Sequence, residues 1–326
     1  MPIHPIFMTP AYRYGSQTPW GGDSLRTVFK KNIPDDRTGE ALEVSAIPTL
    51  NSVAPDGTTM EELIAKHGSS LMGTKVPLPF PLLLKLLNAK EALSVQVHPG
   101  DDYAKQVENK LGKTEAWYIL DAQEGAELIY GIRPGVTKEM LKDALEDGEK
   151  IKELLNYVPV KKGETYFIPA GTVHAIGEGI VLYEIQQSSD VTYRFYDWNR
   201  MDSQGNKREL HIEKALDVVN LNHKAEVATP KCKRTDENGT FELLLDTTYF
   251  ALERITNASD YVIAPNTERF SILTALEKGI IAYDGEQLEI ASGQTVLLPA
   301  DGVQVTLSGG CFLHTYPNVN EVSHDE

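Results

Sequence analysis

Short strand-like runs at regular intervals place the strongest constraint on how this chain can fold. β-Branched and aromatic residues gather in these runs, and Gly, Pro, Asn or Asp separate each run from the next. Such spacing favours an antiparallel sandwich or barrel over alternating strands and helices. We therefore expect a mainly β fold, with strands at residues 116–120, 126–130, 165–168, 181–187, 191–196, 249–255, 270–276, 279–283 and 303–308.

Helical patterns are few. Thr59 and Glu62 have the spacing of a capping box, which predicts a helix from this point to about Leu71. Residues 136–145 and 149–155 read as two short amphipathic helices separated by Gly148, and residues 211–219 as another. The segment near 136–155 is thus predicted to be a small helical insertion in a β protein.

One segment of the chain is echoed further on. Residues 163–174 (GETYFIPAGTVH) align with residues 293–304 (GQTVLLPADGVQ), with Gly, Thr, Pro, Ala and Val at the same spacing. This echo predicts two similar barrels in tandem, over residues 1–225 and 226–326. His174 in the first copy corresponds to Gln304 in the second, which has no comparable His and Glu set nearby. We therefore expect a catalytic, metal-binding first domain and a metal-free second barrel.

Gln96, His98, Glu115 and His174 have the spacing expected of a metal site. Gln96 and His98 lie two residues apart and so share one face of a strand, as do Lys113 and Glu115. His174 follows a Pro-Ala-Gly turn, near the start of its strand. Two His and one Glu form a known catalytic zinc set, with the Gln96 amide oxygen as a further candidate ligand. The same donors would accept manganese, iron or cobalt.

Several motifs, in order, resemble the type I phosphomannose isomerase family of the cupin superfamily. Residues 163–174 resemble the second cupin motif, although Glu178 stands where that motif usually has Asn. The likeness covers residues 1–225 well and the remainder weakly, and the short helical insertion is similar to the compact bacterial form. The segments that carry the family likeness are residues 20–22 (WGG), 93–99 (LSVQVHP), 112–117 (GKTEAW), 174–177 (HAIG) and 184–198 (EIQQSSDVTYRFYDW).

This resemblance implies two tandem cupin-type (jelly-roll) β-barrels and a zinc-dependent aldose–ketose isomerase. The implied reaction interconverts mannose 6-phosphate and fructose 6-phosphate through an enediol. The implied cofactor is one zinc ion per chain, and Arg194 matches the position of the family's catalytic arginine. The positions that match the family's metal ligands are Gln96, His98, Glu115 and His174.

The proton transfer between C1 and C2 has two candidate carriers, Glu184 and Lys113. Arg194 is permanently charged and is a candidate to stabilise the enediolate or to bind phosphate. For Glu184 the alternative role is a salt bridge to Arg194. Lys85, Lys113 and Arg194 are the candidate substrate-binding residues. Lys85 is a lone charge in an apolar run, and an internal salt bridge is its alternative role.

Net charge and cysteine content limit the partners. A net charge of −16 argues against nucleic acid and acidic membranes, so an anionic substrate requires a local cluster of Lys and Arg. Cys232 and Cys311 are the only cysteines, which argues against a disulfide framework. The first residues lack the pattern of a signal peptide, and the apolar runs are too short to cross a bilayer. We expect a cytoplasmic protein, with a monomer favoured, that acts on a small sugar phosphate.

Three other functions fit parts of this pattern. An iron-dependent cupin dioxygenase would use a similar His and Glu set, but Lys113 and Arg194 suit an anionic sugar better. A non-catalytic sugar-binding cupin would be expected to lose the proton-transfer groups, and Lys113, Glu184 and Arg194 are all present. A cupin-type phosphoglucose isomerase is closest in chemistry and would differ in the aldose phosphate that it consumes.

Overall fold

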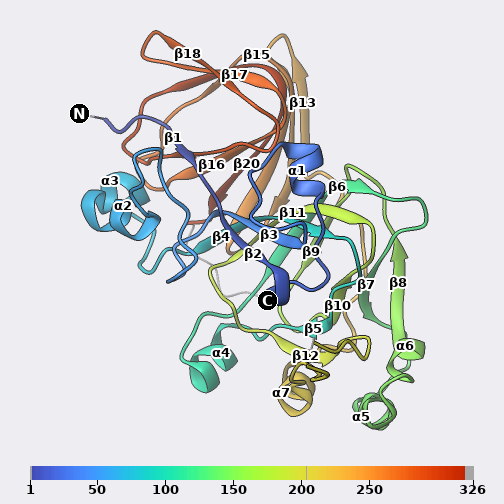
Figure 1. Ribbon diagram of the computed structural model, residues 1–326. Helices are drawn as coiled ribbons and strands as arrows, with labels where there is room; N and C mark the ends of the chain where they lie inside the picture. Colours follow the sequence, from blue (N-terminus) through green and yellow to red (C-terminus); the bar gives the residue numbers. More distant parts are fainter. Residues whose placement is uncertain (1, 203, 320–326) are drawn as a thin grey trace.

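The computed structural model describes residues 2–202 and 204–319, which form three antiparallel sheets with short helices at the periphery (Figure 1). The protein is mainly β, as the strand pattern predicts. The nine predicted strands all occur, with ends that differ by a few residues or, at β15 (Phe250–Ile263) and β20 (Val305–Pro317), by more. Such differences arise because pairing with neighbours, rather than local sequence, decides where a strand ends.

A six-stranded sheet forms the middle layer of the molecule. Every residue of its two central strands β4 and β11 is buried, because each face packs against another sheet. Its strand order is β2 (Ala11–Tyr14), β3 (Thr38–Val44), β4 (Leu82–Ala89), β11 (Ile180–Gln187), β6 (Glu115–Ala122) and β9 (Thr165–Ile168).

Side chains alternate between the two faces of this middle sheet, as the period of two along a strand requires. On β4, Leu84 and Leu86 belong to a core shared with the nine-stranded sheet. Leu87 belongs instead to a core shared with the five-stranded sheet. Lys85 and Glu184 are register partners on β4 and β11, and they lie on this second face. The functional side chains therefore project between the six-stranded and five-stranded sheets.

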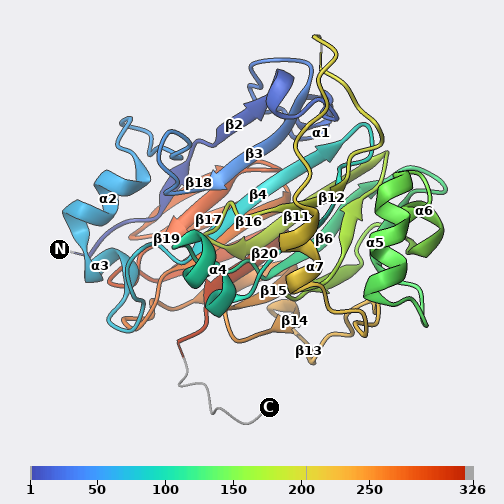
Figure 2. The same ribbon diagram turned by 90° about the horizontal axis from the view of Figure 1, so that it is seen from below.

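A five-stranded sheet covers that face, and helices cover its outer side (Figure 2). Its strand order is β12 (Tyr193–Tyr196), β5 (Val95–Val97), β10 (His174–Ile176), β7 (Glu127–Ile132) and β8 (Leu155–Pro159). The covering helices are α5 (Lys138–Asp147), α6 (Ile151–Leu154) and α7 (Ile212–Val218). These helices confirm the predicted insertion and the predicted helix near 211–219.

The nine-stranded sheet contains the C-terminal strands and one strand from the N-terminus, β1, which pairs with β19. Its main path is β1 (Ile6–Met8), β19 (Thr295–Leu298), β16 (Ser271–Glu277), β20 (Val305–Pro317), β15 (Phe250–Ile263), β14 (Gly239–Asp246) and β13 (Cys232–Asp236). A hairpin of β17 (Gly279–Tyr283) and β18 (Glu286–Ile290) joins it through β20. The curled sheet lies at the top of Figure 1. Its strands enclose a hydrophobic core of their own.

The remaining helices lie at the edges of the sheets. They are α1 (Ser24–Phe29), α2 (Met60–His67), α3 (Ser69–Met72), α4 (Asp101–Glu108) and a 3-10 turn, η1 (Gly15–Gln17). The helix predicted from Thr59 to about Leu71 is divided into α2 and α3 at Gly68, whose φ of 53° lies in the left-handed region. Glycine adopts that conformation at little cost, so the first helix ends there.

The capping box at the start of α2 is formed. The backbone N–H of Glu62 donates to Thr59 Oγ1 at 3.3 Å, and the backbone N–H of Thr59 donates to Glu62 Oε2 at 2.8 Å. Replacing Thr59 by Ala is expected to lower the free energy of unfolding by about 1 kcal/mol, because two helix N-terminal donors lose or loosen their acceptors. Urea unfolding measures this loss. Thr59→Ser, which keeps the acceptor, should retain most of the stability, and equal losses in both variants would contradict the capping role.

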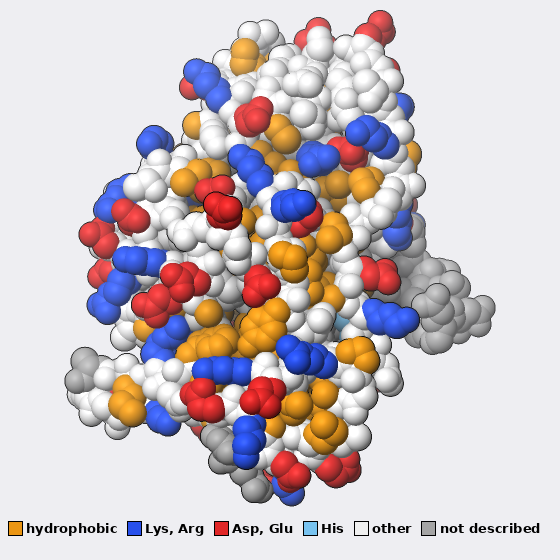
Figure 3. Space-filling view, turned by 90° about the vertical axis from the view of Figure 1, so that its right-hand side faces the viewer, with side chains coloured by type: hydrophobic (Ala, Val, Ile, Leu, Met, Phe, Trp, Pro, Cys, Tyr) orange, Lys and Arg blue, Asp and Glu red, His pale blue; other side chains and the backbone are white. Residues whose placement is uncertain are grey.

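Acidic and basic side chains are interspersed on the face drawn in Figure 3, so that face carries no large patch of one sign despite the net charge of −16. Both cysteines are free thiols, Cys232 exposed and Cys311 buried. Within residues 2–202 and 204–319, no helix has the length and apolar character needed to cross a membrane.

Candidate metal and substrate site

Three buried side chains converge between the five-stranded and six-stranded sheets. His98 directly follows β5, His174 begins β10, and Glu115 begins β6 on the opposite sheet. Each is only 1% exposed, and one potential ligand atom from each lies within 4.8 Å of the others. Glu115 Oε1 lies 3.2 Å from His174 Nε2, and Glu115 Oε2 lies 3.7 Å from His98 Nε2. The sequence spacing predicted this set, and the sheet register brings it together.

Backbone carbonyl groups orient both imidazole rings. His98 Nδ1 lies 2.9 Å from the carbonyl oxygen of Val191, and His174 Nδ1 lies 2.9 Å from that of Thr172. A carbonyl oxygen can only accept, so each Nδ1 carries the proton and donates it. Each Nε2 then presents a lone pair toward Glu115, which is the orientation that a metal ligand needs.

The electrostatics favour the ligand forms of these groups. Burial, with the charge of Lys113 added to it, holds the pKa of His98 well below its usual value, so the ring is neutral near pH 7. Burial alone would raise the pKa of Glu115, but the positive charge of Lys113, aided by the contact with His174, outweighs it and holds that pKa well below normal. Neutral imidazole and ionised carboxylate are the states that bind a cation.

The hydrogen bonding of this group leaves atoms unsatisfied in a way that fits a bound cation. His98 Nε2 and both carboxylate oxygens of Glu115 are buried and accept no hydrogen bond from the described residues, although Lys113 Nζ forms an ion pair with Glu115 Oε2 at 3.0 Å. Buried polar atoms without hydrogen bonds are rare, and a cation held between these side chains would satisfy them. Gln96 is the register partner of His174, and its amide nitrogen lies 3.3 Å from His174 Nε2. If the Gln96 side-chain amide is turned over, its oxygen takes the position of its nitrogen near His174 Nε2. The amide oxygen and nitrogen have nearly the same shape, so both orientations fit.

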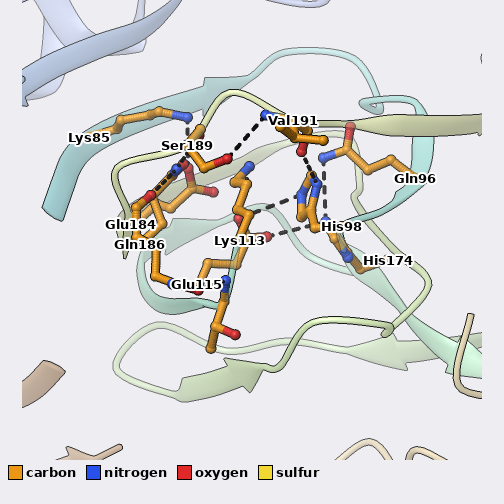
Figure 4. A network of polar contacts seen from close by, with 12 residues as sticks. Lys85, Gln96, His98, Lys113, Glu115, His174, Glu184, Gln186, Ser189 and Val191 are labelled. Carbon is orange, nitrogen blue, oxygen red and sulfur yellow. Dashed lines mark hydrogen bonds and ion pairs between the residues drawn. The ribbon is translucent and has the colours of Figure 1, made fainter. Parts of the chain in front are cut away.

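A second group of buried charges lies beside the first, with Lys113 and Glu115 between them (Figure 4). Lys85 Nζ lies 2.9 Å from Glu184 Oε1 and 3.8 Å from Glu40 Oε1, and Trp117 Nε1 donates to Glu184 Oε2 at 2.9 Å. Burial would lower the pKa of Lys85, but the two carboxylates outweigh it and raise that pKa. Lys85 is therefore an ammonium in an internal ion pair.

The salt bridge considered between Glu184 and Arg194 does not form, since Glu184 pairs with Lys85. Arg194 lies on β12 in the other sheet, where its Nε donates to Ser94 Oγ at 3.2 Å. Its NH1 donates to the carbonyl oxygen of Glu209 at 2.9 Å. Burial and the neighbouring charge of Arg208 lower the pKa of Arg194, which still leaves an arginine charged at neutral pH.

A cleft of roughly 690 Å³, counted to where it opens into solvent, runs alongside both groups. Gln96 and Lys113 line the cleft and connect it to the converging side chains of His98, Glu115 and His174. Five basic and two acidic side chains line the cleft, so basic side chains are in excess there although the protein as a whole is acidic. They are Arg13, Lys85, Lys113, Arg194, Arg208, Glu40 and Asp190.

Sequence reasoning missed Arg13, Glu40 and Arg208 in this cleft. Arg13 and Glu40 lie on the neighbouring strands β2 and β3, and Arg13 NH1 lies 3.2 Å from Glu40 Oε2. Burial opposes the ionisation of Glu40, but Lys85 and Arg13 outweigh it and lower its pKa. Arg208 forms a two-point ion pair with Asp197, with both contacts at 2.7 Å. None of the three lies in a motif, so the sequence alone offered no signal for them.

Comparison with known proteins places this chain among sugar-phosphate isomerases. Residues 12–135 match the model of the family "Phosphomannose isomerase type I, catalytic domain". A probable mannose-6-phosphate isomerase of Bacillus subtilis, GmuF, is 38% identical over 321 residues, which cover 96% of this chain and 99% of that protein. A mannose-6-phosphate isomerase of Streptococcus mutans is 40% identical over 285 residues, covering 86% of this chain and 88% of that protein.

The fold agrees with this placement. The crystal structure of a mannose 6-phosphate isomerase from Bacillus subtilis superposes with a TM-score of 0.88 at 34% sequence identity. The match covers 96% of this chain and 99% of that one. The similarity therefore extends over all three sheets, and it is not confined to the segment around the converging histidines.

Proposed function

Because the chain belongs to the type I phosphomannose isomerase (mannose-6-phosphate isomerase) family, we propose that it interconverts mannose 6-phosphate and fructose 6-phosphate. The reaction is a metal-dependent aldose–ketose isomerisation through an enediol. The observation that carries this proposal is the buried group of His98, Glu115 and His174 beside a cleft with an excess of basic side chains. Such a cleft attracts a sugar phosphate, although the protein as a whole is acidic.

The proposed cofactor is one zinc ion per chain, held by His98, Glu115, His174 and the amide oxygen of Gln96. The unsatisfied atoms of His98 and Glu115 and the fixed Nδ1 protons support this assignment. Two His and one Glu are a frequent catalytic zinc set. When bound, the ion supplies positive charge that orients the substrate oxygens and stabilises charge on them.

The basic side chains of the cleft bind and orient the substrate. Lys85 and Lys113 lie deep in the sandwich, where they are 4% and 6% exposed, and they face the sugar oxygens or the phosphate. Arg194 lines the same cleft from the opposite sheet and is the candidate to stabilise the enediolate. Its hydrogen bonds to Ser94 and to the backbone at Glu209 hold the guanidinium in place before substrate arrives.

Lys113 is our first candidate for moving the proton between C1 and C2, and Glu184 is the second. Lys113 lines the cleft, so its Nζ reaches a bound sugar directly. Both oxygens of Glu184 are engaged, one by Lys85 and the other by Trp117. In this arrangement Glu184 fixes the position of the Lys85 ammonium, and it would have to release one partner before accepting a proton.

At the level of the whole chain we propose two tandem cupin-type barrels, over residues 1–225 and 226–326. The alignment of residues 163–174 with residues 293–304 supports this division, because both segments end one strand and lead into the next. The first barrel carries the metal and the substrate cleft, and the second is metal-free. We also propose that the protein acts in the cytoplasm as a monomer.

The test is an assay of fructose 6-phosphate formation from mannose 6-phosphate, before and after chelation and after zinc is added back. We expect turnover that chelation abolishes and zinc restores, with about one zinc bound per chain by elemental analysis. Glucose 6-phosphate should give little turnover. Full activity in metal-free protein would contradict the metal assignment, and preferential turnover of glucose 6-phosphate would instead favour a phosphoglucose isomerase.

A further inference from the structure

The inner face of the nine-stranded sheet has a second cavity, which shares no lining residue with the substrate cleft. It measures about 530 Å³, counted to its open mouth. Most of its walls are apolar, and Ile3, Phe270, Leu298 and Val305 are among them. A cavity lined mainly by apolar residues, with a few converging polar groups, is the usual form of a small-molecule site. Nothing in the isomerase reaction uses it.

A buried histidine lines this cavity and has one nitrogen without a partner. His314 on β20 is 8% exposed and is the register partner of Glu253 on β15. Its Nδ1 lies 2.8 Å from Glu253 Oε2, and Tyr316 donates to Glu253 Oε1 at 2.6 Å. The Glu253 carboxylate is held ionised, because its contacts with His314 and Tyr316 outweigh burial and lower its pKa.

The Glu253 carboxylate accepts from His314 Nδ1, which leaves Nε2 as the open nitrogen of the ring. That Nε2 is buried and has no hydrogen-bond partner among the described residues. Buried polar atoms in native proteins are almost always paired, so a ring nitrogen left open in the wall of a cavity indicates a missing partner. A ligand hydroxyl supplies such a partner, because it can both donate and accept a hydrogen bond.

A cation completes the polar side of the cavity. Arg269 lines it, and the guanidinium carbon lies 3.5 Å from the centre of the Tyr316 ring. This stacking fixes the plane of the guanidinium and leaves its edge as the hydrogen-bonding surface. A planar guanidinium edge matches the two oxygens of a carboxylate.

We propose that this cavity binds a small hydroxy acid. The carboxylate of the ligand pairs with Arg269, its hydroxyl forms a hydrogen bond with His314 Nε2, and its apolar body packs against the wall near Phe270. The site is independent of the substrate cleft, so binding there leaves the isomerase chemistry intact.

The test is calorimetric titration of the zinc-loaded enzyme with mandelate, in the presence of saturating mannose 6-phosphate to block the substrate cleft and its metal. Phenylacetate lacks the hydroxyl and should bind about three- to tenfold more weakly, whereas mandelamide lacks the charge and should bind about tenfold more weakly or worse. Arg269→Met should remove the preference over mandelamide. His314→Phe should remove the preference over phenylacetate.

Lys278→Met is the matched control, because it removes an exposed cation from the same sheet, one paired with Glu289. It should bind mandelate as the parent protein does, and all three variants should turn over mannose 6-phosphate normally. Absence of saturable mandelate binding would overturn the proposal. Arg269→Met places an apolar side chain at a partly exposed position and is expected to fold. Equal binding of mandelate to this variant and to the parent protein would also overturn the proposal.

Discussion

Replacing Lys113 by Met is expected to reduce kcat for mannose 6-phosphate by about 10²- to 10⁴-fold, which is the usual contribution of a proton-transferring side chain. The zinc content should stay near one ion per chain, because the metal ligands remain. Lys113 Nζ lies 3.0 Å from Glu115 Oε2 and lines the cleft, so its loss removes the amine that reaches the sugar. Steady-state kinetics and exchange of solvent deuterium into the C1 and C2 positions measure the effect.

Two further variants make this result specific. Lys105→Met removes an exposed lysine on α4 and should leave kcat unchanged. Glu184→Gln keeps the size of the side chain and removes its charge. If Lys113 carries the proton, Glu184→Gln should retain more deuterium exchange than Lys113→Met. The reverse order, with exchange lost in Glu184→Gln and preserved in Lys113→Met, would assign the proton transfer to Glu184.

Replacing Lys31 by Met is expected to lower the free energy of unfolding by about 3–5 kcal/mol, because it leaves a carboxylate unpaired in the interior. Lys31 Nζ lies 2.7 Å from Glu43 Oε1, and the two side chains are 9% and 0% exposed. Lys31 also donates to the carbonyl oxygen of Gly293 at 2.8 Å. The pair thus joins the middle sheet to the nine-stranded sheet. Urea unfolding followed by tryptophan fluorescence measures the loss.

This loss should depend on pH in a defined direction. Burial raises the pKa of Glu43, and removing Lys31 takes away the charge that opposes this rise. The folded state then binds a proton more readily than the unfolded state, so stability falls as pH rises from the unfolded pKa of a glutamate, about 4.3. The deficit of Lys31→Met should be smaller at pH 5 than at pH 8.

The exposed pair of Lys75 and Glu268, which are 2.9 Å apart, provides the control. Lys75→Met should cost less than about 1 kcal/mol, as exposed ion pairs usually do. Adding Glu43→Gln to Lys31→Met should recover part of the lost stability and remove its pH dependence. A deficit in Lys31→Met that is small and unaffected by pH would show that the buried carboxylate is already neutral in the folded protein.

The sequence predicted those parts of the site in which local spacing determines the geometry. His98, Glu115 and His174 each begin or follow a strand beside a recognisable turn, so their convergence followed from the motifs. The helices at residues 136–155 and 211–219 also followed from local periodicity. These features depend on a few neighbouring residues, and a single sequence carries that information.

Other features depend on contacts between distant segments, and the sequence did not reveal them. Lys85 and Glu184 are separated by 99 positions and meet only because β4 and β11 pair in one register. The sequence instead suggested Arg194 as the partner of Glu184, and Arg194 lies on the opposite sheet. The pairing of β1 with β19 joins the two ends of the chain, and no periodic pattern indicates such a contact.

The middle sheet has a consequence for how this chain tolerates mutation. Successive residues of β4 serve different purposes, since Leu84 and Leu86 hold two sheets together whereas Lys85 lies at the substrate cleft. The effects of substitutions along β4 and β11 should therefore alternate from one position to the next. Substitutions at positions that pack between the two sheets reduce the amount of folded protein, whereas substitutions at positions facing the cleft reduce turnover per folded molecule. A register slip of one residue would exchange the two sets, so selection for abundance and selection for catalysis act on the same hydrogen-bonded ladder.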